Sequence, residues 1–569
     1  MMASSSPQSV PGQTPADWRW LGVLLLGLFI LYVIQINHGL PNRDIVWGYD
    51  SNPLLPLIAA KKIFVDGWNT GWHTPYPNFH YYVLLVLFTP YMAVQWMLGN
   101  LAALRMEGGY PYGLRDFDTI FMHLAIVTRL VSVAMALGTA YWVYRIGRAV
   151  HSSRAGLFAA AIVGFSPAIV YYVHVETLDV PMLFWLTAAL YCYVRALQTI
   201  ELRFYVWLAI LAAIATATKD YAYGLFVLLP LPLVATLARR SYGSISPATL
   251  LRSAIDRRHL IALAAFAVSF MVAENWWWNF AGFVNHVKLA GGFVPESELI
   301  VTTKIGRLDF FSAQRWRDMG QTMPLVLGWA GLVISVAGVV YSTVRERTVA
   351  ATLVWPALSY YVFTVCQTLP AGVPIERPYM PLGMILAIMG GVLLGRLSAS
   401  RLLVSKVLVA AGVIAIAVNG IAMDLALVDD PRYQAEKWLK QNVASGSTIE
   451  FYGVRSQEPR YNRQWKMVTL NDFPSPSSDV QLTKERVAPK ALALRHPEWI
   501  IVSQVYSDRY SLSEPVGTGG AIRDFFERLP EGELGYGEAS RFRSTISDIF
   551  GFPSRLTPGM TVYGRTPKP

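Results

Sequence analysis

The chain has 569 residues, of which 54% are hydrophobic and only 15% are charged. Soluble globular proteins carry about 25% charged residues, and the mean hydropathy here is +0.37. These values exclude a disordered chain, a collagen and an acidic solvated tail, and they indicate a membrane protein if the apolar residues occur in long runs.

The chain begins with a polar stretch that is rich in serine and proline. It lacks the basic start, the short apolar core and the small-residue cleavage site of a secretory signal peptide. We therefore expect residues 1–19 to be a disordered cytoplasmic leader, followed by a retained membrane anchor.

About eleven apolar runs follow that have roughly the length of a membrane span, for which about 20 predominantly apolar residues are needed. They cover residues 20–38, 119–144, 155–173, 180–198, 204–218, 221–238, 259–278, 324–344, 350–369, 378–395 and 405–425. The sequence therefore predicts an α-helical polytopic membrane domain of about eleven transmembrane helices over residues 20–427.

Basic residues in the short loops predict the orientation of this domain. The chain has 48 Lys and Arg against 37 Asp and Glu, and the basic residues gather after every second run, for example at Arg145, Arg239 and Arg396. The positive-inside rule makes these loops cytoplasmic. The N-terminus is then inside, and residues 39–118 form a long first loop outside. No nucleic-acid recognition motif accompanies the arginines, so we expect no nucleic-acid partner.

The first outer loop, residues 39–118, is too long for a simple connection. It is rich in Trp, Tyr and Pro, and Ser51, Asn52 and Pro53 form a helix-start signal. We expect a short helix on the membrane surface after this signal. The apolar stretch 80–98 is interpreted as an interfacial or re-entrant helix, because a span there would turn all later arginine loops outward.

The tail, residues 428–569, has the alternating pattern of a small α/β domain. Its first helix carries Ala435 and Leu439 on one face and is expected to end at Gly446. The segments TIEFYGV, HPEWIIVSQVY and MTVYGR read as strands, and AIRDFFERL reads as a helix. We expect this domain on the extracytoplasmic side, and a role in acceptor binding is left open.

Ionisable residues in or beside membrane spans are functional candidates, because burying them is costly. Asp50 lies in WGYDSNP, just after the first run. A carboxylate that reaches into a cavity can act as a general base. The alternatives are an ordinary loop acid or a helix cap, and Asp44 is a nearby competitor for the role.

A second group of candidates lies in YYVHVETLDVPM, a short outer turn between two runs. His174, Glu176 and Asp179 offer nitrogen and oxygen ligands, and a divalent metal would need one or two more, such as Asp50. The spacing matches no known metal motif, so no cofactor is assigned and a metal at His174 and Glu176 stays open. The alternative for Asp179 is a helix cap before Pro181.

Lys219 lies in ATATKDYAYG, where it joins two short apolar runs. Because both runs are short, we expect the turn to lie below the outer surface, at the floor of a cavity. A lysine in such a place can bind a phosphate. The alternative is an ion pair with Asp220 or Glu176 and no ligand.

Two arginines are also candidates for phosphate binding. Arg377 lies at the outer mouth of the tenth run, and Arg129 lies near the outer end of the second. The guanidinium group suits phosphate because its donors form a fork. The alternative is that each arginine snorkels to the lipid headgroups, which we favour slightly for Arg129.

Several segments, in this order, resemble those of the polyprenyl-phosphate-dependent GT-C glycosyltransferases, particularly the protein O-mannosyltransferase and lipid A aminoarabinose transferase group. They are YDSNPLLPLIAAKKIFVDG, TPYPNFHYYVLL, the stretch from TRLVSVAMALG to HVETLDVPMLFWLTAAL, ATKDYAYGLFVLLP and ERPYMPLGMIL. The resemblance covers roughly residues 20–425.

The resemblance implies transfer of a sugar from a polyprenyl-phosphate donor to an acceptor glycan, lipid or protein on the extracytoplasmic side, with inversion at the anomeric carbon. Asp50 is similar to the catalytic first-loop aspartate of the family. Lys219 and Arg377 match positions near the donor phosphate, and Glu176 with Asp179 matches the second acidic motif. Membrane lipids are further implied partners, and the plasma (inner) membrane is the implied location.

Two departures from the family pattern narrow the range of activities that the resemblance implies. The mannosyltransferases have Glu where this chain has Ser51, which weakens a protein-mannosylating role. The oligosaccharide-transferring relatives carry WWDYG, which ENWWWNF does not match, so we expect transfer of a single sugar. The alternative function is a transporter or flippase of lipid-linked sugar, for which internal inverted repeats are typical. The sequence shows no such repeat.

Overall fold

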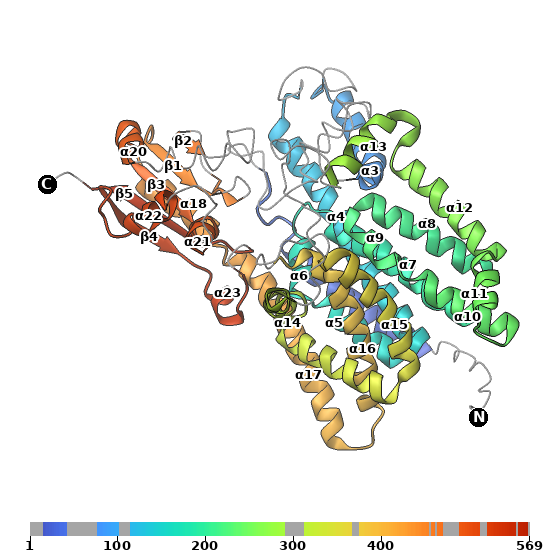
Figure 1. The fold of residues 1–569 in the computed structure, drawn as a ribbon. Helices are drawn as coiled ribbons and strands as arrows, with labels where there is room; N and C mark the ends of the chain where they lie inside the picture. Colours follow the sequence, from blue (N-terminus) through green and yellow to red (C-terminus); the bar gives the residue numbers. More distant parts are fainter. Residues whose placement is uncertain are drawn as a thin grey trace.

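The computed structural model describes residues 15–41, 77–101, 114–290, 312–366, 375–453, 457–460, 464–469, 489–512, 520–553 and 556–566. Within these ranges the chain forms a large helical bundle and a smaller domain built on a sheet, which lies to one side of the bundle (Figure 1). The two parts are joined through α17 (Leu403–Val428) and α18 (Pro431–Asn442).

The bundle contains helices of very different lengths. Its first half comprises α1 (Pro15–Ile34), α3 (Phe79–Met97), α4 (Phe117–Val150), α5 (Ser153–Gly164), α6 (Pro167–Tyr172), α7 (Asp179–Thr199), α8 (Leu202–Thr218), α9 (Tyr223–Phe226), α10 (Pro230–Tyr242) and α11 (Pro247–Ala254). Its second half comprises α12 (Arg257–Ala273), α13 (Trp276–Ala290), α14 (Ala313–Arg345), α15 (Arg347–Tyr360), η4 (Tyr361–Cys366), η5 (Arg377–Tyr379), α16 (Met380–Ser398) and α17.

Within the described ranges, seven helical segments are long and apolar enough to cross a membrane, and three shorter apolar helices accompany them. The seven are Phe117–Val150, Asp179–Thr199, Asp220–Tyr242, Ala313–Arg345, Arg347–Cys366, Arg377–Ser398 and Leu403–Asn442, and the shorter ones are Trp18–Ile34, Ser153–Gly164 and Leu202–Thr218. The predicted polytopic membrane fold is therefore confirmed, whereas the predicted number of eleven spans stays a prediction.

The third predicted span is a broken helix, α5 followed by α6. Ser166 caps α6 by accepting a hydrogen bond from the Ile169 amide, and Pro167 starts the helix. The Ser166 hydroxyl also donates to the carbonyl of Val326 on α14. This bond fixes the break against a neighbouring helix, and it sets where α6 ends, at Tyr172.

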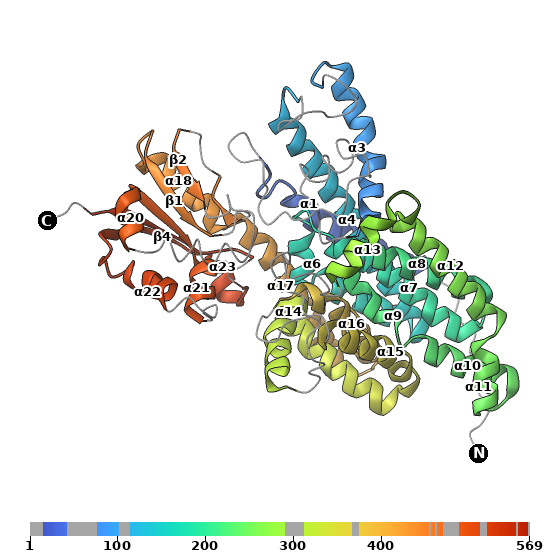
Figure 2. The same cartoon turned by 45° about the horizontal axis from the view of Figure 1, so that its top comes forward.

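The helix α4 is 34 residues long, which at 1.5 Å per residue is roughly 51 Å and exceeds a membrane span. Its first half projects beyond the rest of the bundle, with α3 beside it (Figure 2). Tyr81, Leu84 and Phe88 of α3 pack there against Phe121 and Leu124. The helix α3 is not among the candidate spans, and its predicted interfacial position stays a prediction.

The smaller domain contains a five-stranded sheet of order β2-β1-β3-β5-β4. The strands β1 (Thr448–Tyr452), β2 (Lys466–Thr469) and β3 (Trp499–Ser503) are parallel, and β5 (Met560–Arg565) pairs antiparallel with both β3 and β4 (Tyr536–Phe542). Its other helices are α20 (Pro489–Arg495), α21 (Gln504–Leu512), α22 (Ala521–Arg528) and α23 (Thr545–Phe550).

The predicted small α/β domain is thus confirmed, with β2 and β4 added. Ala435 and Leu439 of α18, which were predicted to share one helical face, are both buried against one face of the sheet. The helix ends at Asn442 rather than at Gly446, because the chain leaves the helical conformation at Val443; Gly446 instead supplies a left-handed turn with φ of 88° before β1.

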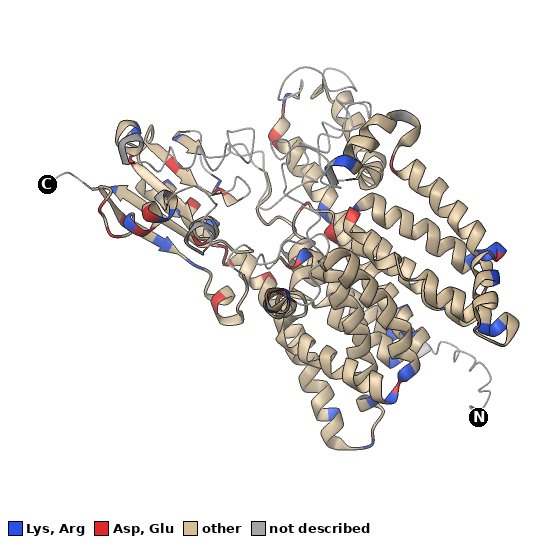
Figure 3. Ribbon diagram, in the orientation of Figure 1, with Lys and Arg blue, Asp and Glu red and all other residues tan. Residues whose placement is uncertain are grey.

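Among the described residues, many lysines and arginines of the bundle gather where α10, α11 and α12 meet and near the connection of α14 to α15 (Figure 3). These are the ends of the helices that lie away from the turn between α6 and α7. The distribution agrees with the loop pattern on which the predicted orientation depends.

Candidate active site

Three of the loops that carry predicted site residues meet at one end of the bundle. The helix α6 ends at Tyr172 and α7 begins at Asp179, so residues 173–178 form a tight turn. Lys219 follows directly after α8, and Arg377 begins η5. Since α7 packs against both α8 and α16, these turns are neighbours in space.

Lys219 and Asp179 form a buried ion pair at this end. The Lys219 Nζ lies 2.6 Å from Asp179 Oδ1, and the side chains are 5% and 1% exposed. The alternative named for Lys219 was an ion pair with Asp220 or Glu176. The lysine instead meets Asp179, because it follows α8 in an extended conformation that leads it to the start of α7, and Asp220 also lies within electrostatic range of it. Asp179 is also not a helix cap: it is the first residue of α7, and Leu178 holds the cap position.

Arg377 lies next to this ion pair. Its Nε donates a hydrogen bond of 3.0 Å to the Tyr172 hydroxyl, and its guanidinium lies 5.0 Å from the centre of the Tyr172 ring. The Tyr172 hydroxyl in turn donates to Glu376. Arg377 is close enough to both Asp179 and Lys219 to interact with them electrostatically, so two cations and one carboxylate share this place.

Tyrosines complete the surroundings of the ion pair. Tyr360 is fully buried and lies within electrostatic range of Asp179, Tyr221 and Tyr379. Among the described residues, neither the Tyr360 hydroxyl nor Asp179 Oδ2 has a hydrogen-bond partner. Buried polar atoms are normally paired with protein, water or ligand, so these two atoms have hydrogen-bonding capacity that a bound polar group would use.

Three residues of this site, Tyr172, Glu376 and Tyr360, were not predicted from the sequence. Tyr172 and Glu376 lie within two residues of the predicted His174 and Arg377, and this proximity was the signal that could have found them. No signal in the sequence points to Tyr360, which lies in the middle of an apolar run.

Arg129 does not snorkel to the headgroups, so the alternative that we favoured slightly is wrong. Its side chain is fully buried because it binds acceptors inside the protein. Its Nε donates to Glu176 Oε1 at 2.6 Å, and its Nη1 donates to the carbonyls of Ile36 and His38 at 2.7 and 2.5 Å. The second acidic motif is therefore divided between two cations: Glu176 pairs with Arg129, and Asp179 pairs with Lys219.

His174 lies beside these pairs but faces another helix. Its Nδ1 is 2.6 Å from the Val170 carbonyl, and its Nε2 is 3.9 Å from Asp424 Oδ1 on α17. Glu176 faces Arg129 instead. Within the described ranges, no three His, Cys, Asp or Glu side chains converge as a metal site would need. The metal hypothesis for His174 and Glu176 therefore stays a prediction without a ligand set.

Asp50, its competitor Asp44 and the helix signal at Ser51 lie outside the described residues. The role of Asp50 as general base therefore stays a prediction. The described chain closest to it on the N-terminal side is the segment that leaves α1, residues 35–41.

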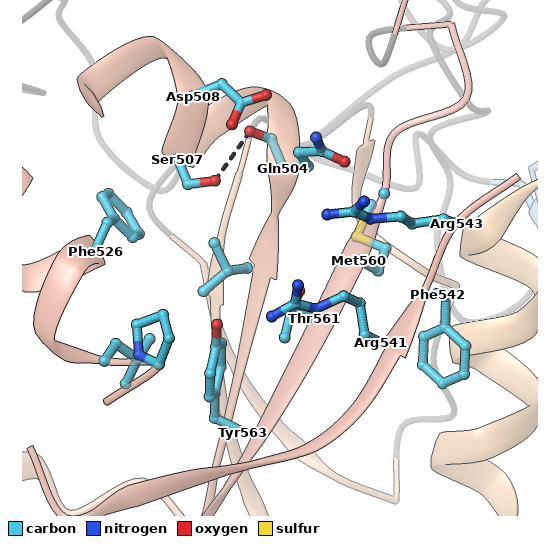
Figure 4. Close-up of a pocket in the computed structure, with 14 residues that line it drawn as sticks. Gln504, Ser507, Asp508, Phe526, Arg541, Phe542, Arg543, Met560, Thr561 and Tyr563 are labelled. Atoms are coloured by element: carbon cyan, nitrogen blue, oxygen red, sulfur yellow. Dashed lines mark hydrogen bonds between the residues drawn. The ribbon is translucent and has the colours of Figure 1, made fainter. Parts of the chain in front are cut away.

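A separate cavity of about 190 Å³ lies in the smaller domain, where β3 ends and α21 begins (Figure 4). Asp508, Arg541 and Arg543 line it together with Phe526 and Tyr563. Burial raises the pKa of Asp508 above its ordinary value, although a hydrogen bond from Gln504 and the charge of Arg543 oppose this shift. Charged donors and acceptors beside aromatic rings suit a hydroxyl-rich ligand, but none of the predicted site residues lies here.

Residues 109–278, less than half of the chain, match the family model described as dolichyl-phosphate-mannose-protein mannosyltransferase. The predicted GT-C resemblance is thereby confirmed. The matched region runs through α4 to α12 and contains both Asp179 and Lys219. No match was found among curated proteins.

Solved structures with the GT-C architecture are also similar to the chain. The oligosaccharyltransferase AglB from Archaeoglobus fulgidus, with an inhibitory peptide and a dolichol-phosphate, is 12% identical over 94% of this chain and 74% of its own, with a TM-score of 0.46. ArnT from Cupriavidus metallidurans, bound to undecaprenyl phosphate, is 14% identical over 96% and 98%, with a TM-score of 0.49. The arabinofuranosyltransferase AftD from Mycobacteria is 13% identical over 98% and 42%, with a TM-score of 0.39.

Proposed function

We propose that this protein is an integral membrane glycosyltransferase that transfers a single sugar from a polyprenyl-phosphate donor to an acceptor hydroxyl on the extracytoplasmic side. The observation that carries the proposal is the family match over residues 109–278, because the matched region holds the buried pair of Asp179 and Lys219. The acceptor is a glycan, a lipid or a protein, and ENWWWNF in place of WWDYG favours a single sugar over a preassembled glycan.

In this proposal Lys219 and Arg377 neutralise the phosphate of the donor. Both cations lie at the same end of the bundle, and Asp179 holds Lys219 Nζ in place at 2.6 Å. Charge develops on the leaving phosphate when the sugar is transferred, and fixed cations in a site that excludes water stabilise such charge strongly. Tyr172 and Tyr360 supply hydroxyl groups beside them.

Asp50 acts as the general base of the proposed reaction. It takes the proton of the acceptor hydroxyl, whose oxygen forms a bond to the anomeric carbon. The bond between that carbon and the phosphate oxygen breaks, and the polyprenyl phosphate leaves with the electron pair. Attack opposite to the leaving group inverts the anomeric centre. No metal is assigned a role in this scheme.

We further propose that the N-terminus is cytoplasmic and that the domain over residues 428–569 is extracytoplasmic, in the plasma (inner) membrane. The basic loops at the far ends of the helices support this orientation, and they lie away from the turn between α6 and α7 (Figure 3). The site then faces the side of the membrane that nucleotide sugars do not reach, which suits a lipid-linked donor.

The test offers radiolabelled polyprenyl-phosphate sugars and a panel of acceptors to the purified protein in lipid nanodiscs. Asp50→Asn is expected to abolish transfer while leaving donor binding intact. Asp44→Asn serves as the matched control, since it removes an acid from the same loop. Transfer by Asp50→Asn at the native rate would refute the assignment of the base.

The alternative function is a transporter of lipid-linked sugar, and the same preparation distinguishes it. In proteoliposomes loaded with the labelled donor on one side, an enzyme releases polyprenyl phosphate and labels the acceptor. Movement of the intact donor across the bilayer, with no glycosidic bond broken, would exclude the enzyme and establish the transporter.

A further inference from the structure

The backbone of the segment that leaves α1 toward the first outer loop is held by four hydrogen bonds to side chains from distant parts of the chain. Residues 36–40 follow the end of α1 at Ile34. Three carbonyls and one amide of this short segment bind side chains from α4, from α18 and from Arg460. Gly39 has a φ of 53°, a conformation that suits glycine.

The bundle holds one side of this segment. Arg129 Nη1 donates to the carbonyls of Ile36 and His38 at 2.7 and 2.5 Å. Its Nε is bound to Glu176, and both side chains are fully buried. The guanidinium is therefore fixed in orientation and joins the segment to the turn that precedes Asp179.

The smaller domain holds the other side. The Tyr433 hydroxyl accepts a hydrogen bond of 2.6 Å from the Gly39 amide, and Arg460 Nη1 donates to the Leu40 carbonyl at 3.2 Å. The His38 ring meets the Tyr433 ring edge-on at 5.7 Å. Arg460 and Leu40 are 420 residues apart in the sequence, so these contacts exist only when the smaller domain is docked.

Tyr433 and Arg460 are themselves fixed by their neighbours. Arg460 binds Glu436 through Nε and Nη2 at 2.9 and 3.1 Å, and its guanidinium lies 5.0 Å from the centre of the Tyr433 ring. Asp430 caps α18 by accepting from the Arg432 amide at 2.9 Å. The side chains of Tyr433 and Arg460 are thus fixed by contacts within the smaller domain, and they in turn fix the position of residues 36–40.

We propose that Tyr433 and Arg460 are positioning residues, through which the docked smaller domain fixes residues 36–40, the start of the first outer loop. This inference rests on the proposed function for the role of Asp50, which lies ten residues beyond Leu40. In that function Asp50 belongs to the same loop, so a change at the anchored start of the loop is expected to affect the rate of transfer. A misplacement of about 1 Å can cost a hundredfold in rate.

The same contacts give Arg129 a role as an anchor instead of the phosphate-binding role for which it was a candidate. Its Nε and Nη1 are committed to Glu176 and to residues 36–40, which is the arrangement of an anchor between the loop start and the acidic turn. In this proposal Arg129 acts on the reaction through the loop, and the donor phosphate is left to Lys219 and Arg377.

Tyr433→Phe in the full-length protein tests the proposal, because it removes one hydroxyl and keeps the ring. Hydrogen–deuterium exchange of the Gly39 amide, followed in short peptides that cover residues 36–41, is expected to become at least about tenfold faster, since this amide loses its partner. The kcat of sugar transfer is expected to fall about tenfold or more, while the donor KM stays within about twofold of the native value. Arg460→Lys is expected to give an intermediate loss of kcat and Arg460→Met a full one.

Tyr536→Phe is the matched control, because the Tyr536 hydroxyl donates a buried hydrogen bond of 2.7 Å to the Pro497 carbonyl in the same domain. It is expected to leave exchange at residues 36–41 and kcat unchanged. Native exchange in Tyr433→Phe, or an equal loss of kcat in both variants, would overturn the positioning role. If exchange rises in Tyr433→Phe but the native protein transfers no sugar, the anchor stands and the proposed function fails.

Discussion

At the scale of single residues, the ion pair of Lys219 and Asp179 contributes to stability and, in the proposed function, to donor binding, and a single variant cannot separate these two effects. Removing the cation of a buried ion pair destabilises a protein by about 3–5 kcal/mol, because the carboxylate stays buried without a partner. We therefore expect Lys219→Met to lower the thermal stability of the purified protein substantially, in addition to any effect on donor binding. Loss of activity in that variant alone says nothing about the phosphate.

The double variant Lys219→Met with Asp179→Leu separates the two effects. Replacing both buried charges by apolar groups of similar size is often neutral or stabilising, so most of the thermal stability is expected to return. The donor KM is expected to stay raised at least about tenfold, which corresponds to one lost charge-assisted contact of about 1.4 kcal/mol. A native donor KM in the double variant would show that Lys219 is only the ion-pair partner of Asp179 and does not bind the donor phosphate.

Sequence reasoning found the residues of this end of the bundle but not their pairing. Counting spans placed Glu176, Asp179, Lys219 and Arg377 on one side, because alternate turns of antiparallel helices share a side. The rotation of neighbouring helices and their offset by a few ångströms decide which carboxylate contacts which cation. The hydropathy pattern does not determine either quantity. The same limit explains why Arg129 was expected at the lipid headgroups.

At the scale of elements, the central helices pack through glycine. A methyl group on Gly391 of α16 would lie 2.5 Å from the Ala155 carbonyl oxygen and 2.6 Å from the Ala159 methyl on α5, too close for either backbone to accept. Small residues let membrane helices approach in this way. We expect Gly391→Ala to destabilise the protein by about 1–3 kcal/mol, measured as a lower midpoint of thermal unfolding in detergent.

Gly27→Ala on α1 is the matched control, since a methyl group there meets no atom within 4 Å. Alanine favours a helix over glycine by about 0.5–1 kcal/mol, so this variant is expected to be neutral or slightly stabilised. Equal destabilisation of both variants would show that the loss at Gly391 does not come from helix contact.

The elements of the smaller domain were partly visible in the sequence. TIEFYGV, HPEWIIVSQVY and MTVYGR contain β1, β3 and β5, which occupy the centre of the sheet and are therefore apolar. The strands that were missed, β2 and β4, lie at the two edges. Because an edge strand buries few of its side chains, the alternation of apolar and polar residues in β4 is weak. Glu538 and Arg541 of this strand, for example, form an ion pair on the surface.

At the scale of the whole molecule, the contact between the bundle and the smaller domain has a pH-dependent component at His38. The His38 ring is buried, with its Nε2 3.5 Å from Asp430 Oδ2. Burial and the charges of Arg432, Arg129, His174 and Arg460 lower its pKa well below the ordinary value of 6.5. No feature of the sequence relates His38 to residues 392 positions away, so this junction was not predictable.

The sign of the effect follows from the lowered pKa. The folded protein keeps His38 neutral, whereas the unfolded chain binds a proton below about pH 6.5, so acid favours unfolding. The contribution of His38 to stability is therefore fully present well above this pH and is lost progressively as the pH falls below it. His38→Gln removes the titration and keeps a polar side chain of similar length. Thermal unfolding is measured at pH 7.5 and at pH 5. Between these two pH values, His38→Gln is expected to lose less stability than the native protein. An equal loss in both proteins would show that the acid sensitivity comes from other residues.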